Sequence, residues 1–196
     1  MIVESPAKAR TIENILGDGY RVVASVGHVR DLPTYGYGIE DFDSFKPKYV
    51  VIKDKKAGVD KSDIIEDIAN AARDADAVYL STDPDREGEA ISWHIVEAAG
   101  IPREKARRVI FHEITPPAIE EAFRHPTSLN DDLVEAQQAR RVLDRLIGFP
   151  LTWFVQRKVA RSASAGRVQS VALRLIVERE REIQSFVPQE YWTIHA

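Results

Sequence analysis

Residues 77–88 read Ala-Val-Tyr-Leu-Ser-Thr-Asp-Pro-Asp-Arg-Glu-Gly, and the fold class of the chain can be predicted from them. Its apolar start predicts a buried strand over 77–81, and the apolar spacing that follows predicts a helix from Gly88 to Ala99. A strand that leads directly into a helix is the building unit of an open α/β sheet. We therefore expect Asp83, Asp85 and Glu87 to lie where a sheet strand ends.

The same alternation of strand and helix extends through the first 115 residues. Strands are predicted at 1–3, 20–26, 49–52 and 108–111, and helices at 6–16 and 61–73. Ser5 can cap the first helix, with Pro6 at its first position, where the missing N–H costs nothing. The pattern predicts an open, mostly parallel α/β sheet flanked by helices, with residues 31–48 as a long surface loop.

Helical spacing dominates after residue 115. Pro116 opens one helix, Asn130 caps a longer one, and a third covers about 166–184. We expect their apolar residues to face inward, among them Leu133, Leu143, Leu146, Ile147, Val168, Val171, Leu175 and Ile176. Residues 191–194 then read as a strand with no later strand to pair with, so we expect the chain to be truncated.

The composition is that of a globular protein. Of the 196 residues, 44% are hydrophobic and 30% are charged, and no apolar run approaches the roughly 18 residues of a membrane span. The chain has no cysteine, which excludes disulfides, thiolate metal sites and cysteine nucleophiles. We expect a cytoplasmic protein without a membrane partner.

Charge is distributed unevenly along the chain. Residues 1–117 contain 16 basic and 21 acidic side chains, a net charge of −5. Residues 140–174 contain eight basic side chains and one acidic one, Asp144, a net charge of +7. Carboxylates of the first part are suited to holding a cation, and arginines of the second to meeting a polyanion.

Three carboxylates follow the strand at 77–81. If this segment stays extended, Asp83, Asp85 and Glu87 point to one side, about 6.5–7 Å apart. Carboxylates this close repel unless they share a cation, and oxygen ligands without histidine or cysteine suit Mg²⁺ or Mn²⁺. Glu4 follows another strand and can converge on the same edge. The alternative is that Asp83 or Asp85 only caps the next helix.

These residues carry a family resemblance. Glu4 with Asp83-x-Asp85-x-Glu87 resembles the Toprim signature, which type IA topoisomerases, bacterial primases and some nucleases share. Five blocks resemble bacterial DNA topoisomerases of type IA and occur in that family's order: IVESPAKARTI (2–12), SVGHVRDLP (25–33), TDPDREGEAI (82–91), EAQQARR (135–141) and SAGRVQS (164–170).

The resemblance implies three parts of a longer enzyme: a Toprim domain at 1–115, a partial helical DNA-binding domain at 116–190 and the start of a truncated further domain at 191–196. It implies relaxation of negatively supercoiled DNA without ATP, through a transient 5′-phosphotyrosine on one strand. The chain lacks a Walker A pattern, which agrees with ATP independence. The expected location is the cytoplasm of a bacterium, at the nucleoid.

Site residues follow from the same resemblance. It implies catalytic roles for Glu4, Lys8, Asp83, Asp85 and Glu87, with Mg²⁺ held by Asp83 and Asp85 and supported by Glu87 and Glu4. It implies contacts to single-stranded DNA by His28, Arg140, Arg141, Asp144, Phe149, Gln156, Ser164, Ala165, Gly166, Arg167, Val168 and Gln169. Trp93 and His94 are expected to be packing residues.

The chain departs from the family pattern at three places. Phe149 stands where tyrosine is frequent, and Gln156 where tryptophan is frequent. None of the six tyrosines lies in the family's nucleophile motif, so we expect the chain to be inactive alone and to depend on the remaining domains of its parent. The alternatives are a non-catalytic Mg²⁺-dependent nucleic-acid-binding module, another Toprim enzyme such as a nuclease or primase, or the topoisomerase part of a reverse gyrase.

Overall fold

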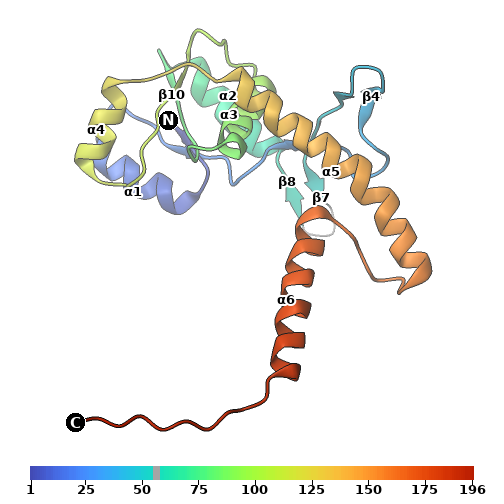
Figure 1. Cartoon of the computed structure of the whole chain (residues 1–196). Coiled ribbons are helices and arrows are strands. Elements are labelled where there is room, and N and C mark those ends of the chain that lie inside the picture. The colour runs from blue at the N-terminus through green and yellow to red at the C-terminus, as the bar shows by residue number, and fades with distance from the viewer. Residues whose placement is uncertain (55–57) are drawn as a thin grey trace. The chain divides into compact units, whose positions relative to one another are not determined.

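The computed structural model of the chain describes residues 1–54 and 58–196 (Figure 1). Contacts divide these residues into two compact units, Met1–Val142 and Leu143–Ala196, each of which is described by itself.

A four-stranded parallel sheet forms the centre of the first unit. Its order is β10-β9-β1-β2, with β1 at Ile2–Val3, β2 at Val23–Ala24, β9 at Val78–Ser81 and β10 at Ala106–Arg108. Val3 is level with Ala24 on one side and with Ser81 on the other, so the carboxyl ends of β1, β2 and β9 are aligned. The predicted open parallel α/β sheet is confirmed, although the second strand is shorter than residues 20–26.

Helices cover both faces of this sheet. Adjacent residues of a strand point to opposite faces, and β1 shows this directly. Ile2 packs into a cluster with Ile68 of α2 (Ser62–Arg73) and Ile95 of α3 (Arg86–Ala99). Val3 packs into a second cluster with Ile12 of α1 (Pro6–Leu16) and Ile119 of α4 (Pro116–Arg124).

Three small antiparallel pairs accompany the main sheet. They join β3 (Arg30–Asp31) to β6 (Val50–Val51), β4 (Ile39–Asp41) to β5 (Lys46–Pro47), and β7 (Lys53–Asp54) to β8 (Val59–Asp60). The segment 31–48, predicted as a long surface loop, therefore contains a hairpin that the sequence analysis did not predict. Aspartate turns explain it, because Asp41 accepts the N–H groups of Asp43 and Ser44 and so closes the turn.

Two long helices and an extended tail complete the chain. Helix α5 covers Asp131–Lys158, with Val142 as its last residue in the first unit, and α6 covers Arg167–Ser185. The expected inward face is confirmed for α4, where Ile119 is buried, but it is wrong for the second part of α5 and for α6. There Leu143, Ile147, Val168 and Leu175 are 50% to 65% exposed, because no described segment covers them. Residues 191–194 form no strand, since a strand needs a hydrogen-bonded neighbour and they have none in the described chain.

None of the helices described has an apolar stretch of the length that a bilayer core requires.

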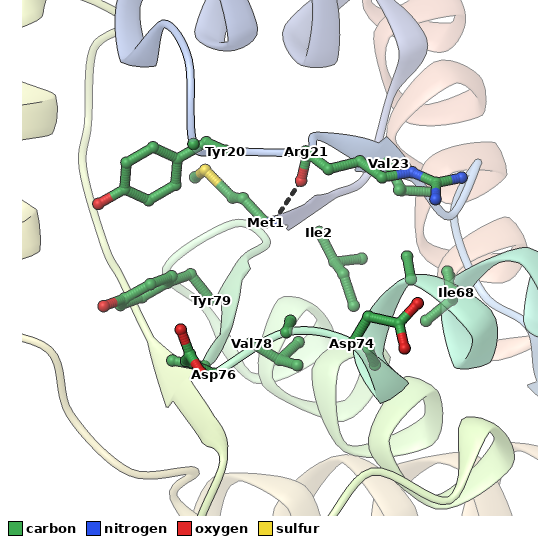
Figure 2. A pocket seen from close by; sticks show the side chains of 15 residues that line it. Met1, Ile2, Tyr20, Arg21, Val23, Ile68, Asp74, Asp76, Val78 and Tyr79 are labelled. Atoms are coloured by element: carbon green, nitrogen blue, oxygen red, sulfur yellow. Dashed lines mark hydrogen bonds between the residues drawn. The ribbon is translucent and has the colours of Figure 1, made fainter.

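A pocket of about 340 Å³ lies at the amino ends of the strands. Figure 2 shows its lining, which comes from the start of β1, the segment before β2, the end of α2 and the start of β9. Within it the α-amino group of Met1 donates to the Arg21 carbonyl oxygen at 2.6 Å. Ligands of open parallel sheets bind at the opposite, carboxyl ends of the strands, so this pocket is not the candidate active site.

Candidate active site

Glu4 and Asp83 meet where two neighbouring strands end. Glu4 follows β1 directly, and Asp83 stands two residues after β9. The backbone N–H of Asp83 donates to Glu4 Oε1 at 2.6 Å, and the N–H of Gly27, beyond the end of β2, donates to the Glu4 carbonyl oxygen at 3.1 Å. Glu4 is thus hydrogen-bonded to the segments that follow the two neighbouring strands, β9 and β2.

Helix α1 brings a lysine to the same edge. Its N-cap is Ser5, whose Oγ accepts the backbone N–H of Lys8, so the first turn is fixed as the sequence predicts. Lys8 Nζ lies 2.8 Å from Asp83 Oδ1. This hydrogen bond raises the pKa of Lys8, which therefore stays protonated. Lys8 is the cation that offsets the Asp83 carboxylate.

The acidic segment turns into helix earlier than its spacing suggests. Helix α3 begins at Arg86, and its N-cap Asp85 accepts the backbone N–H of Gly88 at 2.8 Å. Glu87 is therefore in the first helical turn, so the segment is not extended through Glu87, and the alternative that Asp85 caps the helix is confirmed. Capping explains the difference, because Asp85 satisfies an N–H that the helix leaves without an intrahelical partner.

Glu87 faces a different set of partners from Asp83. Its Oε2 accepts the side-chain amide of Gln137 at 3.0 Å and lies 3.9 Å from His28 Nε2, and its Oε1 lies 3.8 Å from Arg140. Burial lowers the pKa of His28, so its imidazole is mainly neutral at pH 7. Glu87 thus joins the sheet edge to helix α5.

The chemistry of these side chains suits Mg²⁺. Asp83 and Asp85 are exposed and offer hard carboxylate oxygens, the ligands that Mg²⁺ prefers. Within residues 1–54 and 58–196, however, no three acidic or histidine side chains stand close enough together to enclose a metal ion. The carboxylate oxygens fit the ion chemically. In this structure, Lys8 lies beside the Asp83 carboxylate and Arg140 lies beside the Glu87 carboxylate.

A buried ion pair supports the acidic loop, which is the segment 82–85 between β9 and α3. Arg108 of β10 is 1% exposed and pairs with Glu89 of α3 at 2.9 Å. Its guanidinium also donates to the carbonyl oxygens of Leu80 and Asp83. Sequence reasoning missed both residues, because a pair 19 positions apart shows no periodic pattern.

An aromatic and basic cluster lies next to His28. His94 is buried, and its Nδ1 accepts from Arg30 Nε at 3.2 Å. The Arg30 guanidinium lies over the Trp93 ring at 5.0 Å and over the Tyr49 ring at 5.8 Å. The ring centroids of His28 and His94 are 6.1 Å apart. Trp93 and His94 therefore pack against each other and against their neighbours, as the sequence predicts.

Arg141 binds the edge of the sheet region. Its Nε donates to Asp31 Oδ1 at 2.8 Å, and a second guanidinium N–H donates to Asp31 Oδ2. Asp31 also accepts the backbone N–H of Leu32. The pair is bidentate, a geometry that phosphate and carboxylate share as partners of arginine.

The second unit contains the other predicted DNA contacts. Arg167, at the start of α6, donates twice to Asp144 of α5, at 2.9 and 3.1 Å. Thr152 Oγ1 bonds both the N–H and the carbonyl oxygen of Ala165 and so fixes residues 164–166 against α5. Arg145 lies over the Phe149 ring at 4.6 Å.

The remaining predicted contacts of this unit are on its surface. Ser164 Oγ lies 3.4 Å from Gln169 Oε1, Gly166 is the N-cap of α6, and Val168 and Gln156 are exposed. Trp153, three residues before Gln156, is 54% exposed and lies 6.2 Å from Phe149 between ring centroids. Position 156 carries no ring in this chain, and the exposed rings of this helix are those of Trp153 and Phe154.

Comparison with known proteins identifies the family. Residues 1–114 match the Toprim domain model and residues 128–196 match the DNA topoisomerase model. The chain is similar to full-length topoisomerase I from Thermotoga maritima, with 43% sequence identity and a TM-score of 0.80. The match covers 96% of this chain and 31% of that one, so the chain spans about a third of the length of the solved enzyme. The chain therefore belongs to the bacterial type IA DNA topoisomerases, with a Toprim domain in its first part.

Proposed function

We propose that this chain supplies the acidic half of a type IA topoisomerase active site and part of its track for single-stranded DNA. The parent enzyme relaxes negatively supercoiled DNA by cutting one strand, passing the other through the gap and rejoining the cut. The observation that carries the proposal is the hydrogen-bonded group of Glu4, Lys8 and Asp83 at the carboxyl edge of a Toprim sheet.

The chemistry divides between this chain and the rest of the enzyme. A tyrosine outside residues 1–196 attacks a phosphodiester and the 3′ oxygen leaves, which gives a 5′-phosphotyrosine. The reverse attack restores the diester, so bond energy is conserved and ATP is not consumed. Glu4 carries the proton to or from the leaving oxygen, and the protonated Lys8 holds the phosphate by charge.

The carboxylates have a second role. Asp83 and Asp85 would hold Mg²⁺ with support from Glu87 and Glu4, and the ion would supply positive charge that offsets the negative charge of the phosphate. The chain's own residues do the rest of the positioning, since Asp85 fixes the start of α3 and the Asp83 N–H holds the Glu4 carboxylate.

The DNA track combines paired arginines with exposed rings. Arg140, Arg141 and Arg167 each already bind a carboxylate. Phosphate takes the bidentate geometry of the Arg141 and Arg167 pairs, so DNA can replace these carboxylates as the partner. His28, Gln156 and residues 164–169 add polar contacts, Asp144 accepts from a base amino group, and Phe149 stacks on a base.

We place the Toprim domain at 1–115, the helical DNA-binding part at 116–190 and the start of a further domain at 191–196, in a bacterial cytoplasmic enzyme associated with the nucleoid.

Removing two carboxylates tests the metal role. Mg²⁺ is expected to raise the Tm of the chain by mass action, and Asp83→Asn with Asp85→Asn to abolish that rise. Differential scanning fluorimetry across a Mg²⁺ titration measures both. The matched control is Asp74→Asn with Asp76→Asn, a second exposed Asp-x-Asp pair that precedes β9 and lines the pocket at the opposite end of the sheet. An equal Mg²⁺ response in the Asp83/Asp85 variant and the wild type would contradict the assignment.

Salt dependence tests the DNA track. Each phosphate contact to a single strand contributes about 0.7 to the slope of log affinity against log salt concentration. Replacing Arg141 and Arg167 with alanine removes two contacts and is expected to make the slope shallower by about 1.4. Fluorescence anisotropy with a labelled single-stranded oligodeoxynucleotide measures the slope between low and moderate salt.

The control for this experiment removes equal charge at exposed positions outside the track. Arg73 ends α2 and Arg124 ends α4, and both are exposed. Their double alanine variant is expected to keep the wild-type slope. If both double variants flatten the slope equally, non-specific charge explains the binding and the proposed track is wrong.

A further inference from the structure

Val26 has a backbone conformation that its side chain disfavours. Its φ is +56°, in the left-handed region, and Gly27 follows at φ +78°. Glycine adopts this region freely, but a β-branched residue does so at a cost of the order of 1–3 kcal/mol. The Val26 side chain is 50% exposed, so its burial does not offset this cost. The compensation must come from the backbone around it.

A buried lysine provides that compensation. Lys61 is 7% exposed, and its Nζ donates to the Val26 carbonyl oxygen at 2.6 Å and to the Ser25 carbonyl oxygen at 3.3 Å. Among the side chains that the structure describes, no carboxylate pairs with this ammonium. A buried ammonium is costly unless hydrogen-bond acceptors surround it. The carbonyl oxygens of Ser25 and Val26 serve here, and they do so only while the turn keeps its conformation.

The lysine itself is anchored on both sides. Its backbone N–H donates to the Ile52 carbonyl oxygen, and its carbonyl oxygen accepts the N–H of Ile65 in the first turn of α2. Ile52 in turn donates its N–H to the carbonyl oxygen of Val29, which is fully buried. The position of Lys61 is therefore fixed relative to residues on both sides of His28.

We propose that Lys61 is a positioning residue of the active site: its ammonium holds Val26 and Gly27 in the left-handed conformation that places His28 beside Glu87. The turn follows the end of β2, where the Gly27 N–H donates to the Glu4 carbonyl oxygen. It ends at Val29, whose carbonyl oxygen accepts the Ile52 N–H. A relaxed Val26 would rotate the next peptides and move both the Gly27 hydrogen bond and the His28 ring. The importance of His28 for DNA rests on the proposed function, whereas the role of Lys61 in the turn does not.

A double-mutant cycle on the whole chain tests this inference. Lys61→Met keeps length and apolar stem but removes the donor. The expected result is about tenfold faster hydrogen exchange of the Gly27 amide and loss of the nuclear Overhauser contact between the His28 and His94 rings. Adding Val26→Gly to Lys61→Met is expected to restore both to within about twofold of the wild type, because glycine needs no help at positive φ. A merely structural role of Lys61 predicts no such rescue.

Matched variants separate the turn from general destabilisation. Lys105 likewise donates its ammonium to the backbone, in its case to the Ala75 carbonyl oxygen, and its replacement by methionine is expected to leave Gly27 exchange unchanged. If Lys61→Met folds too poorly to measure, Lys61→Gln keeps a shorter donor and is expected to give a smaller acceleration that Val26→Gly also reverses. Equal exchange in Lys61→Met and wild type, or failure of Val26→Gly to rescue, would overturn the inference.

A DNA readout distinguishes this inference from the proposed function. Lys61→Met and His28→Ala are each measured for affinity to a single-stranded oligodeoxynucleotide. If the exchange and ring contacts change as expected while neither variant alters affinity, the turn is held by Lys61 and the DNA role of His28 is wrong. If His28→Ala weakens binding while Lys61→Met leaves exchange, ring contacts and affinity unchanged, the positioning role is wrong and the DNA role of His28 stands.

Discussion

Replacing Gly88 with alanine is expected to displace the acidic loop and to lower the free energy of unfolding by about 3 kcal/mol, the upper end of the usual cost of overpacking. A Cβ at Gly88 would lie 2.1 Å from the Asp83 carbonyl oxygen and 2.8 Å from its nitrogen. Both are backbone atoms and cannot rotate away. The loop therefore has to move, and with it the N–H that holds Glu4.

Urea denaturation of the Gly88→Ala variant measures the stability loss, and the Mg²⁺-dependent rise in Tm measures the displaced loop. The free energy of unfolding and the Mg²⁺-dependent rise in Tm are both expected to be smaller in this variant than in the wild type. Gly148→Ala is the matched control, because Gly148 is also inside a helix but its nearest atom would be 3.7 Å from the new Cβ. That variant is expected to be neutral or stabilised by up to about 1 kcal/mol through helix propensity. A Gly88→Ala variant as stable as wild type would show that the loop yields without cost.

The sequence predicts the arrangement around Glu4 and Asp83 because both depend on local pattern and topology. Ser5 and Pro6 start α1 through their own chemistry, and this places Lys8 one turn after Glu4. Parallel strands in neighbouring positions bring their carboxyl ends to one edge, so two acidic residues that follow two such strands must be close. Strand order brings the two residues close enough for the Asp83 N–H to donate to the Glu4 carboxylate.

The details that the sequence could not predict depend on competition or on long-range contacts. Asp85 caps α3 and is also the proposed metal ligand, and periodicity alone does not predict which of these roles its carboxylate takes. Apolar spacing predicts which face of α6 is apolar, but not whether another segment covers it. Lys61 looks like a surface lysine at a helix start, and only the path of the chain from Val26 to Val29 brings carbonyl groups to its ammonium.

Acid is expected to destabilise the chain through His94. Burial, with smaller contributions from Arg30 and His28, lowers the pKa of this imidazole from 6.5 to about 3 in the folded protein. The unfolded chain therefore binds a proton between those values and the folded chain does not, so stability is complete above pH 6.5 and falls as pH decreases toward 3. Between pH 7 and pH 4 the loss is about 3 kcal/mol, from roughly 1.4 kcal/mol for each unit below 6.5.

The His94→Gln variant isolates this contribution, because glutamine does not titrate but still offers an acceptor to Arg30 Nε, the donor that binds His94 in the wild type. Urea denaturation at pH 7, 5 and 4 is expected to show a stability loss that is smaller in His94→Gln than in wild type by about 3 kcal/mol. Carboxylates titrate in both proteins and cancel in the difference. His125→Gln is the control for the loss of an imidazole as such, because His125 is exposed and lies outside this cluster, and the effect of His94→Gln is measured against it. If His94→Gln loses stability with acid as steeply as wild type, His94 is protonated in the folded chain, and the cluster with Arg30, Tyr49 and Trp93 opens to accommodate its charge.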